Sequence, residues 1–281
     1  MKRTSHIAGV SLVELLVALG IGLALSLAMA TLHARVSHLY GRTTAAADAQ
    51  DTLRIALATL EYELAHAGYW GLVPDAAHIA GRRGDVAPLA AAVAGDCGPA
   101  WAIDLDRPLV GWSGGWPLAC APFAGAAPVS GGLVLRRVAT APRTPDAGVL
   151  QVYGDPWGGR LGVSGAPAAP GESVHDLVAR AYYVSPRATA DPTRPSLRRK
   201  TLQRGPRVID EEMVVGIARM DVALGVDTDA PGDPGHGQPN RFVAPELASG
   251  EVVAVRVRLT SDEDARLSLT RTIALRNGPV P

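Results

Sequence analysis

Cysteine is scarce in this chain of 281 residues: only Cys97 and Cys120 are present, and they form no Cys-x-x-Cys pair. A structural zinc site needs four ligands at workable spacing, and no histidine lies near either cysteine. The sequence therefore gives no indication of a metal centre built on cysteine. In a reducing compartment the two thiols would be ordinary core residues, whereas in the periplasm we expect them to form a disulfide.

Lysine and net charge are low as well. Lys2 and Lys200 are the only lysines among 27 basic residues, and the formal net charge is zero. This balance argues against a surface built as a whole to bind nucleic acid or acidic lipid, although it leaves local patches open. With 47% hydrophobic residues, the chain can form a packed core, which excludes global disorder.

Catalytic motifs are missing too. Ser164 lies in Gly-Val-Ser-Gly-Ala, which lacks the second glycine of a nucleophile elbow. The seven histidines include no His-Glu-x-x-His pattern, and the chain has no glycine-rich phosphate loop. We therefore expect a protein that is not an enzyme and needs no cofactor.

The N-terminus, in contrast, carries a long apolar run. Its residues 10–30 have only three polar members, Ser11, Glu14 and Ser26, and Lys2 and Arg3 precede it. As a helix, 21 residues at about 1.5 Å each would be roughly 31 Å long, enough to cross the hydrocarbon core of a bilayer. Positive residues before the span predict a cytoplasmic N-terminus and an exported C-terminal part.

Glu14 separates three interpretations of this run. A cleaved secretory signal would use a site such as Ala28-Met29-Ala30, after a shorter apolar core. A plain signal anchor would have no need of a carboxylate in the span. Since a carboxylate inside the membrane costs about 2.5–3.5 kcal/mol, its presence indicates a purpose.

The segment Gly9-Val10-Ser11-Leu12-Val13-Glu14-Leu15 resembles the type III signal of type IV pilins and pseudopilins. The resemblance implies that prepilin peptidase cleaves after Gly9, that Val10 becomes the N-methylated N-terminus, and that Glu14 is the fifth mature residue. The family most often has Phe where this chain has Val10. In an assembled filament, Glu14 would neutralise the N-terminal amine of a neighbouring subunit, which relieves the cost of burying either charge alone.

The helical period continues beyond the span. Leu32, Val36, Leu39, Thr43, Ala46, Gln50, Leu53, Leu57, Leu60 and Leu64 recur at steps of three and four. Gly68 and then Pro74 provide a stop. We therefore expect one helix over residues 10–67, with a bend at Gly41 and a C-terminal half packed on a globular head.

Residues 68–281 read as that head. Strand-like runs alternate with loops rich in glycine and proline. The runs are Leu133–Ala139, Val149–Tyr153, Leu177–Val184, Leu197–Gln203, Met213–Val226 with a break near Gly216, Val252–Thr260 and Leu267–Leu275, the last closing the sheet. In the sixth run, Val253, Val255, Val257 and Leu259 should share one face. Residues 73–129 read as an irregular insertion clipped by the cysteines, with little core of its own. The expected fold class is α+β: a leader (residues 1–9), a long N-terminal α-helix that is transmembrane over 10–30, and a mainly antiparallel β-sheet.

Several head segments resemble the PilW family of minor pilins. They are Ala67-Gly68-Tyr69-Trp70-Gly71, Gly132-Leu133-Val134-Leu135-Arg136-Arg137, Ala181-Tyr182-Tyr183-Val184, Gly225-Val226-Asp227-Thr228-Asp229, the 252–259 strand and Ala274-Leu275-Arg276-Asn277. The resemblance implies a subunit of a type IV pilus, anchored in the inner membrane with a periplasmic head. Its partners would be prepilin peptidase, other minor pilins and the major pilin, and its roles would be motility, adhesion or DNA uptake. The alternatives are a minor pseudopilin of a type II secretion system and a signal-anchored periplasmic binding domain.

Three further features have a functional and a plain structural interpretation. Asp227, Asp229 and Asp233 resemble part of a calcium loop, but Pro231 and Gln238 occupy ligand positions, so a solvated acidic turn is favoured.

A basic cluster (Arg198, Arg199, Lys200, Arg204 and Arg207) could contact DNA phosphates, but a charged, solvated strand edge is favoured. Tyr69 and Trp70 could form an adhesive patch, but a core position at the helix end is favoured.

Overall fold

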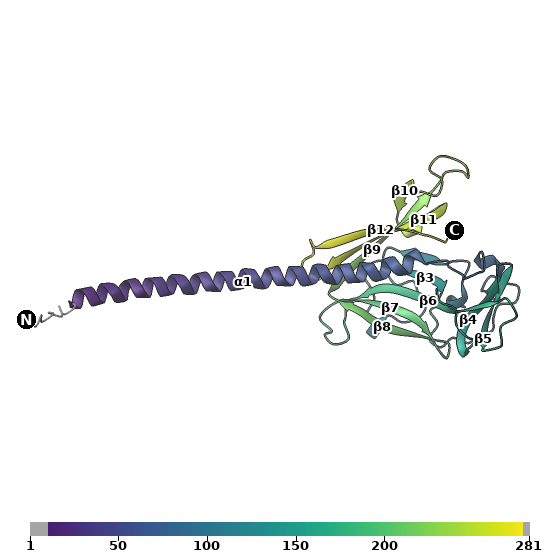
Figure 1. Cartoon of the computed structure of the whole chain (residues 1–281), viewed down its shortest axis with the longest axis horizontal. Helices are drawn as coiled ribbons and strands as arrows, with labels where there is room; N and C mark the ends of the chain where they lie inside the picture. The colour runs from purple at the N-terminus through teal and green to yellow at the C-terminus, as the bar shows by residue number, and fades with distance from the viewer. Residues whose placement is uncertain (1–10, 278–281) are drawn as a thin grey trace, which may run out of the picture. The chain divides into compact units, whose positions relative to one another are not determined.

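The computed structural model describes residues 11–277, except the side chains of His38 and Arg42. The chain divides into two compact units, Met1–Asp48 and Ala49–Pro281. One helix, α1 (Leu12–Ala65), contributes to both units (Figure 1). It is continuous through Gly41, the position where the sequence suggests a bend. An α+β fold with a long N-terminal helix is therefore present, as predicted.

The end of α1 follows from one glycine. Gly68 has φ of +74°, in the left-handed region that other residues avoid, and its N–H donates to the carbonyl of Arg136 at 3.0 Å. The chain thus leaves the helix and passes directly onto the sheet. The predicted stop is at the right residue, although the regular helix ends at Ala65.

The second unit contains two sheets. The larger sheet has the order β1-β5-β4-β6-β3-β2, with β7 paired to β6 and β8 paired to β7; the smaller has the order β10-β9-β11-β12. All pairs are antiparallel except β1 with β5. The strands of the larger sheet are β1 (Ile79–Ala80), β2 (Leu109–Trp112), β3 (Gly132–Val138), β4 (Ala147–Asp155), β5 (Gly158–Ser164), β6 (Ser173–Ser185), β7 (Ser196–Gln203) and β8 (Arg207–Val215). Those of the smaller sheet are β9 (Ile217–Asp227), β10 (Arg241–Val243), β11 (Glu251–Ser261) and β12 (Ser268–Ala274), and the short 3₁₀ helices are Ala76–His78, Trp101–Ile103, Phe123–Gly125 and Pro245–Leu247.

All seven predicted runs are strands, and Gly216, with φ of +95°, breaks the fifth run into β8 and β9. The prediction of a single sheet is wrong, because this break moves the chain from one sheet to the other. β12 therefore lies at the edge of the smaller sheet instead of closing one large sheet. The expected face of β11 also shifts at Val253: a bulge between Val252 and Ala254 places Val252, not Val253, in the core with Val255.

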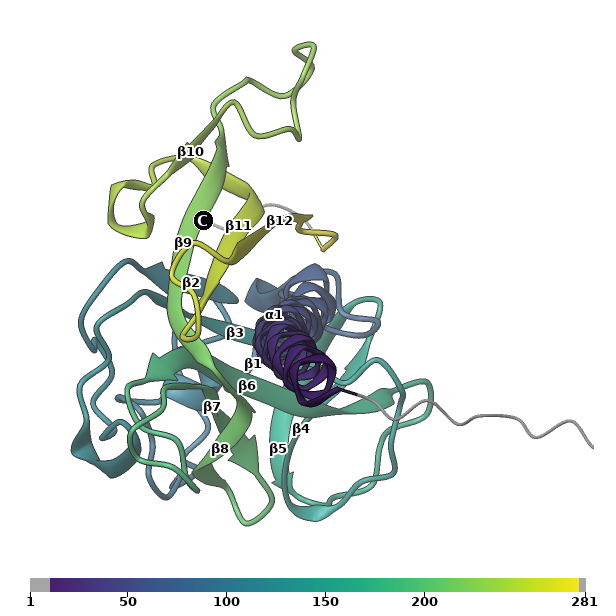
Figure 2. The same cartoon turned by 90° about the vertical axis from the view of Figure 1, so that its left-hand side faces the viewer.

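The C-terminal part of α1 packs into a core between the two sheets (Figure 2). Leu53, Leu60 and Leu64 have no exposed surface there. Their partners come from both sheets and include Leu133 of β3, Tyr182 of β6, Met220 of β9, Val255 of β11 and Ile273 of β12. The predicted apolar stripe is thus buried from Leu53 onward.

A second core lies on the opposite face of the larger sheet. Because successive residues of a strand point to opposite faces, Val134 and Tyr183 belong to this core while their neighbours Leu133 and Tyr182 face the helix. The insertion supplies the other side, with Trp101, Ile103, Leu105 and Trp112 buried. The expectation that the insertion has little core of its own is therefore wrong.

Candidate functional site

The part of α1 in the first unit is exposed, and its residues 12–32 are mostly apolar. Every described side chain from Ser11 to Asp48 is exposed. A window of 18 residues reaches a mean hydropathy of 2.3, and none of it is buried. The large apolar side chains of its first part are Leu12, Val13, Leu15, Leu16, Val17, Leu19, Ile21, Leu23, Leu25, Leu27 and Met29. This helix is long and apolar enough to cross a membrane.

Glu14 lies in the first turn of this helix. It is the only ionisable residue from Ser11 to Leu32. The backbone N–H of Glu14 donates to Oγ of Ser11 at 3.2 Å, and the N–H of Leu15 donates to the carbonyl of Ser11. Ser11 is therefore the N-cap, and Ser11-Leu12-Val13-Glu14 has the spacing of a capping box.

This cap is a structural role for Ser11 that the sequence analysis missed, although the Ser-x-x-Glu pattern was visible. A carboxylate in the first turn also interacts favourably with the positive end of the helix dipole. Gly9 and Val10, the predicted processing residues, lie outside the described residues.

Cys97 and Cys120 form a disulfide, as predicted. Cys97 is buried in the core of the insertion, and its carbonyl accepts the N–H of Ala119 at 3.0 Å. Trp116 donates its indole N–H to the carbonyl of Cys120 at 2.6 Å. The bond thus fastens the loop that covers the second core, and it agrees with an oxidising compartment.

The basic cluster predicted as a DNA contact is largely neutralised. Arg198, only 2% exposed, stacks on Phe123 and bonds to Asp210 and Glu212. Three more ion pairs follow: Lys200 with Asp210 at 2.8 Å, Arg199 with Glu211 at 2.7 Å and Arg204 with Asp146 at 2.7 Å. Of the five, only the exposed Arg207 forms no ion pair with the described residues.

The favoured alternative, a solvated strand edge, is wrong for the three cations of β7. β7, which carries Arg198, Arg199 and Lys200, pairs with β6 on one side and β8 on the other, so β8 is the edge strand. The carboxylates of β8 lie opposite the cations of β7 in register, as with Arg199 and Glu211. Cross-strand pairing therefore explains the charge pattern, and the arrangement does not favour a phosphate-binding patch.

The acidic loop does not bring its three predicted carboxylates together as ligands. Asp227 accepts N–H groups from Asp229 at 2.9 Å and Gly237 at 2.5 Å, and these bonds hold its pKa below the ordinary value. Asp233 accepts the N–H of Ala230 at 3.2 Å. Each of these acceptors is therefore engaged within the loop, as expected for a structural turn.

A different group forms beside Asp227. Its carboxylate lies 3.3 Å from Nδ1 of His236, and ligand atoms of Asp227, His236 and Glu251 all fall within 4.8 Å of one another. The pairing of β9 with β11, which places Asp227 opposite Glu251, creates this group. The sequence analysis assigned no partner to either strand, so it gave no signal for this group. Because Asp227 already accepts two backbone N–H groups, we assign the group a structural role.

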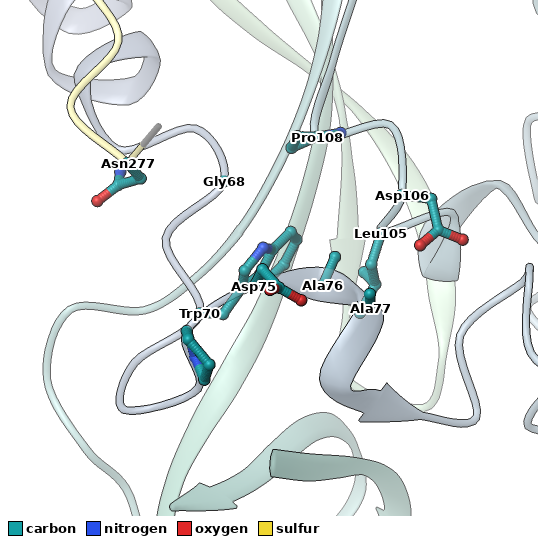
Figure 3. A pocket seen from close by; sticks show the side chains of 10 residues that line it. Gly68, Trp70, Asp75, Ala76, Ala77, Leu105, Asp106, Pro108 and Asn277 are labelled. Carbon is teal, nitrogen blue, oxygen red and sulfur yellow. The ribbon is translucent and has the colours of Figure 1, made fainter. Parts of the chain in front are cut away.

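A pocket of about 320 Å³ lies where the chain leaves α1 (Figure 3). Gly68, Trp70, Asp106, Pro108 and Asn277 are among its lining residues. Trp70 is buried, which confirms its predicted core position, and Asn277 donates its side-chain N–H to the carbonyl of Ala67 at 3.2 Å.

The two carboxylates of this pocket have partners of their own. Asp75 bonds to His78 at 2.7 Å and Asp106 bonds to Arg82 at 2.7 Å. We therefore assign this pocket a structural role: it lies where Asn277, which follows the last strand, is hydrogen-bonded to Ala67 at the end of α1.

Comparison with protein-family models, with curated proteins and with solved structures finds no match for this chain. The chain's own residues therefore have to indicate its function, above all the exposed apolar helix with a carboxylate in its first turn.

Proposed function

We propose that this chain is a minor pilin, similar to the PilW family, which helps to initiate a type IV pilus and becomes part of it. The observation that carries the proposal is the composition of α1. One uninterrupted helix is exposed and apolar over residues 12–32, where Glu14 is its only ionisable residue, and its C-terminal part packs in the core of the second unit. Such a helix can leave the membrane and enter a filament without a change of fold.

The charge of Glu14 would favour assembly of the subunits. A carboxylate in the hydrocarbon core costs about 2.5–3.5 kcal/mol on insertion scales. If prepilin peptidase cleaves after Gly9, a new ammonium group appears at Val10. Packing of helices then lets Glu14 of one subunit neutralise the amine of another, so the charges favour the filament over the isolated subunit.

The second unit favours a subunit needed in few copies. It holds two sheets and a long insertion that is covered by loops and fastened by the disulfide. A major pilin repeats many times on a narrow lattice, which suits a smaller head. We place this chain in an initiating or tip complex with other minor pilins and the major pilin, its head in the periplasm and later at the cell surface.

The first test is the mature N-terminus. Intact-mass and N-terminal peptide measurements on protein extracted from membranes should find a chain that begins at N-methylated Val10. A chain that begins at Met1 would indicate a signal-anchored domain. A chain that begins after Ala30 would indicate a cleaved secretory signal. Either result would overturn the proposal.

The second test separates the charge of Glu14 from the helix cap that Ser11 forms. Glu14→Ala should still insert and be cleaved, because the span becomes more apolar, but it should be depleted from sheared pili. Ser11→Ala is the matched control: it removes the helix cap, at a cost of about 1 kcal/mol, and keeps the carboxylate. If both variants enter pili equally well, Glu14 has no assembly role.

The third test distinguishes the pilus from the secretion system. A deletion strain should lose surface pili and twitching motility and should still export folded hydrolases. Normal piliation with failed hydrolase export would identify a minor pseudopilin instead.

A further inference from the structure

A second pocket, of about 300 Å³, lies beside the disulfide on the insertion side of the larger sheet. Most of its wall is apolar or aromatic and includes Trp101, Trp112, Val110, Val134, Pro117 and Leu118. The charged residues in the lining are Arg83, Arg107, Arg136 and Asp104. The pocket thus combines apolar walls with an excess of positive charge, and its volume is at the lower end of the range for small-molecule sites.

Arg136 is the unusual member of this lining. It is 2% exposed, and its guanidinium donates from Nε to the carbonyl of Trp101 at 2.7 Å and from Nη1 to the carbonyl of Arg107 at 2.6 Å. It forms no ion pair with the described residues, and its Nη2 group donates no hydrogen bond to them. Burial of this charge lowers the pKa of Arg136 to about 10. The carboxylate of Asp104 offsets this lowering of the pKa in part, but it forms no ion pair with Arg136, so the pocket favours a further acceptor of negative charge.

The nearest carboxylate in the lining does not fill this role. Asp104 bonds to Arg83 at 2.9 Å and forms no ion pair with Arg136. The indole N–H groups of Trp101 and Trp112 are also buried and donate to no acceptor in the described part of the chain. Three donor groups around one small pocket therefore lack a protein acceptor.

We propose that this pocket binds a small apolar carboxylate. Its carboxylate accepts from Nη2 of Arg136, and its apolar part packs against Trp101 and Trp112. A phosphate group fits less well, because it carries more charge and most of the wall is apolar or aromatic. The carboxylate could belong to a free acid or to the C-terminal residue of a peptide, which have the same chemistry.

The experiment uses the full chain in detergent micelles, with sodium benzoate as the probe and neutral benzamide as its control. Calorimetry should show saturable binding of benzoate and not of benzamide. Arg136→Met removes a charged donor worth about 1.5–3 kcal/mol, so the Kd should rise by about tenfold to a hundredfold. Arg107→Gln alters an exposed lining residue and keeps the variant test available if Arg136→Met does not fold. It should raise the Kd severalfold.

Arg143→Gln is the matched control, since Arg143 is an exposed arginine outside the pocket. Its Kd should equal that of the unaltered chain. The proposal is overturned if benzoate shows no saturable binding, if benzamide binds as well, or if Arg107→Gln and Arg143→Gln behave alike.

A second arm identifies the source of the carboxylate. A tetrapeptide with a C-terminal leucine carboxylate is compared with its amide and with benzoate. Tighter binding of the peptide acid assigns the pocket to a protein C-terminus, and tighter binding of benzoate assigns it to a free acid. Equal binding of the peptide acid and its amide, together with no binding of benzoate, overturns the proposal.

Discussion

The two faces of the larger sheet are built by the same strands but are covered in different ways. One face packs on α1, the other on the irregular insertion. Arg136 and Arg137 are neighbours on β3 and point to opposite faces. Their surroundings can therefore be compared to see how each face accommodates a buried arginine. Arg137 meets Glu63 of α1 at 3.1 Å, and Arg180 of β6 bonds to the same carboxylate. Arg136 donates to two backbone carbonyls and lies over the ring of Trp101, and it forms no ion pair with the described residues.

This difference shows how the helix and the insertion each compensate a buried positive charge. A helix side chain has a fixed height and direction, so a single glutamate can be placed against two arginines. An irregular loop presents its own backbone instead, and carbonyl dipoles offset a positive charge only in part. On the helix face both arginines thus share an ion pair with a carboxylate, whereas on the insertion face Arg136 forms no ion pair with the described residues and lies beside a pocket.

The largest effect is expected on the helix face. Glu63→Ala would strand Arg137 and Arg180 without their carboxylate and should lower the free energy of unfolding by about 3–5 kcal/mol. Glu61→Ala is the matched control, because Glu61 is on the same helix but is 52% exposed and forms a long ion pair of 4.0 Å with Arg271. This change should lower the free energy of unfolding by less than about 1 kcal/mol. Urea unfolding of the three chains measures both, and equal losses would remove the contrast between a buried and an exposed carboxylate.

The disulfide should affect the insertion face next. Cys97→Ser combined with Cys120→Ser opens a loop with a sequence separation of 23. The chain-entropy estimate is a loss of about 3 kcal/mol. Hydrogen exchange should show lost protection at β2 and little change at the helix residues Leu53–Leu64. Uniform loss of protection across both faces would mean that the two coverings unfold together.

A smaller effect is expected from Arg136→Met. The change leaves two carbonyls without a donor, but it also removes a buried charge that has no carboxylate partner. The two terms offset each other, and the free energy of unfolding should fall by less than about 2 kcal/mol. A loss as large as that of Glu63→Ala, measured in the same urea titration, would show that the insertion face compensates its arginine fully.

The smallest effect is expected in the loop after β9, which belongs to neither face. Hydrogen bonds from Asp229 and Gly237 lower the pKa of Asp227 below 3.8, so its contribution to stability is complete above that pH. It is lost as the pH falls through the lower, folded-state pKa. Asp227→Asn should therefore flatten the acid limb of the stability profile below about pH 4. An unchanged limb would show that these hydrogen bonds do not favour the carboxylate.

Much of the fold could be predicted because its signals are local. The spacing of Leu53, Leu57, Leu60 and Leu64 marks the buried helix face, and Gly68 and Gly216 mark two chain reversals by their backbone freedom. The disulfide could be predicted because two cysteines allow one pairing and because the segment that holds them was expected to be exported. The Ser11 cap is equally local, because it joins residues three apart in the sequence, and the Ser-x-x-Glu spacing could have predicted it.

The sequence by itself determined the long helix, its apolar first part, the carboxylate at Glu14 and the seven predicted strand runs, because each depends on residues close together in the chain; it did not indicate β1, β2, β5 or β10. Only the tertiary structure decided that the chain forms two sheets, that the cations of β7 face the carboxylates of β8, and that Glu63 meets Arg137 while Arg136 has no such partner. These outcomes depend on which strands pair and in which register. Register joins residues far apart in sequence, and no local period encodes that choice.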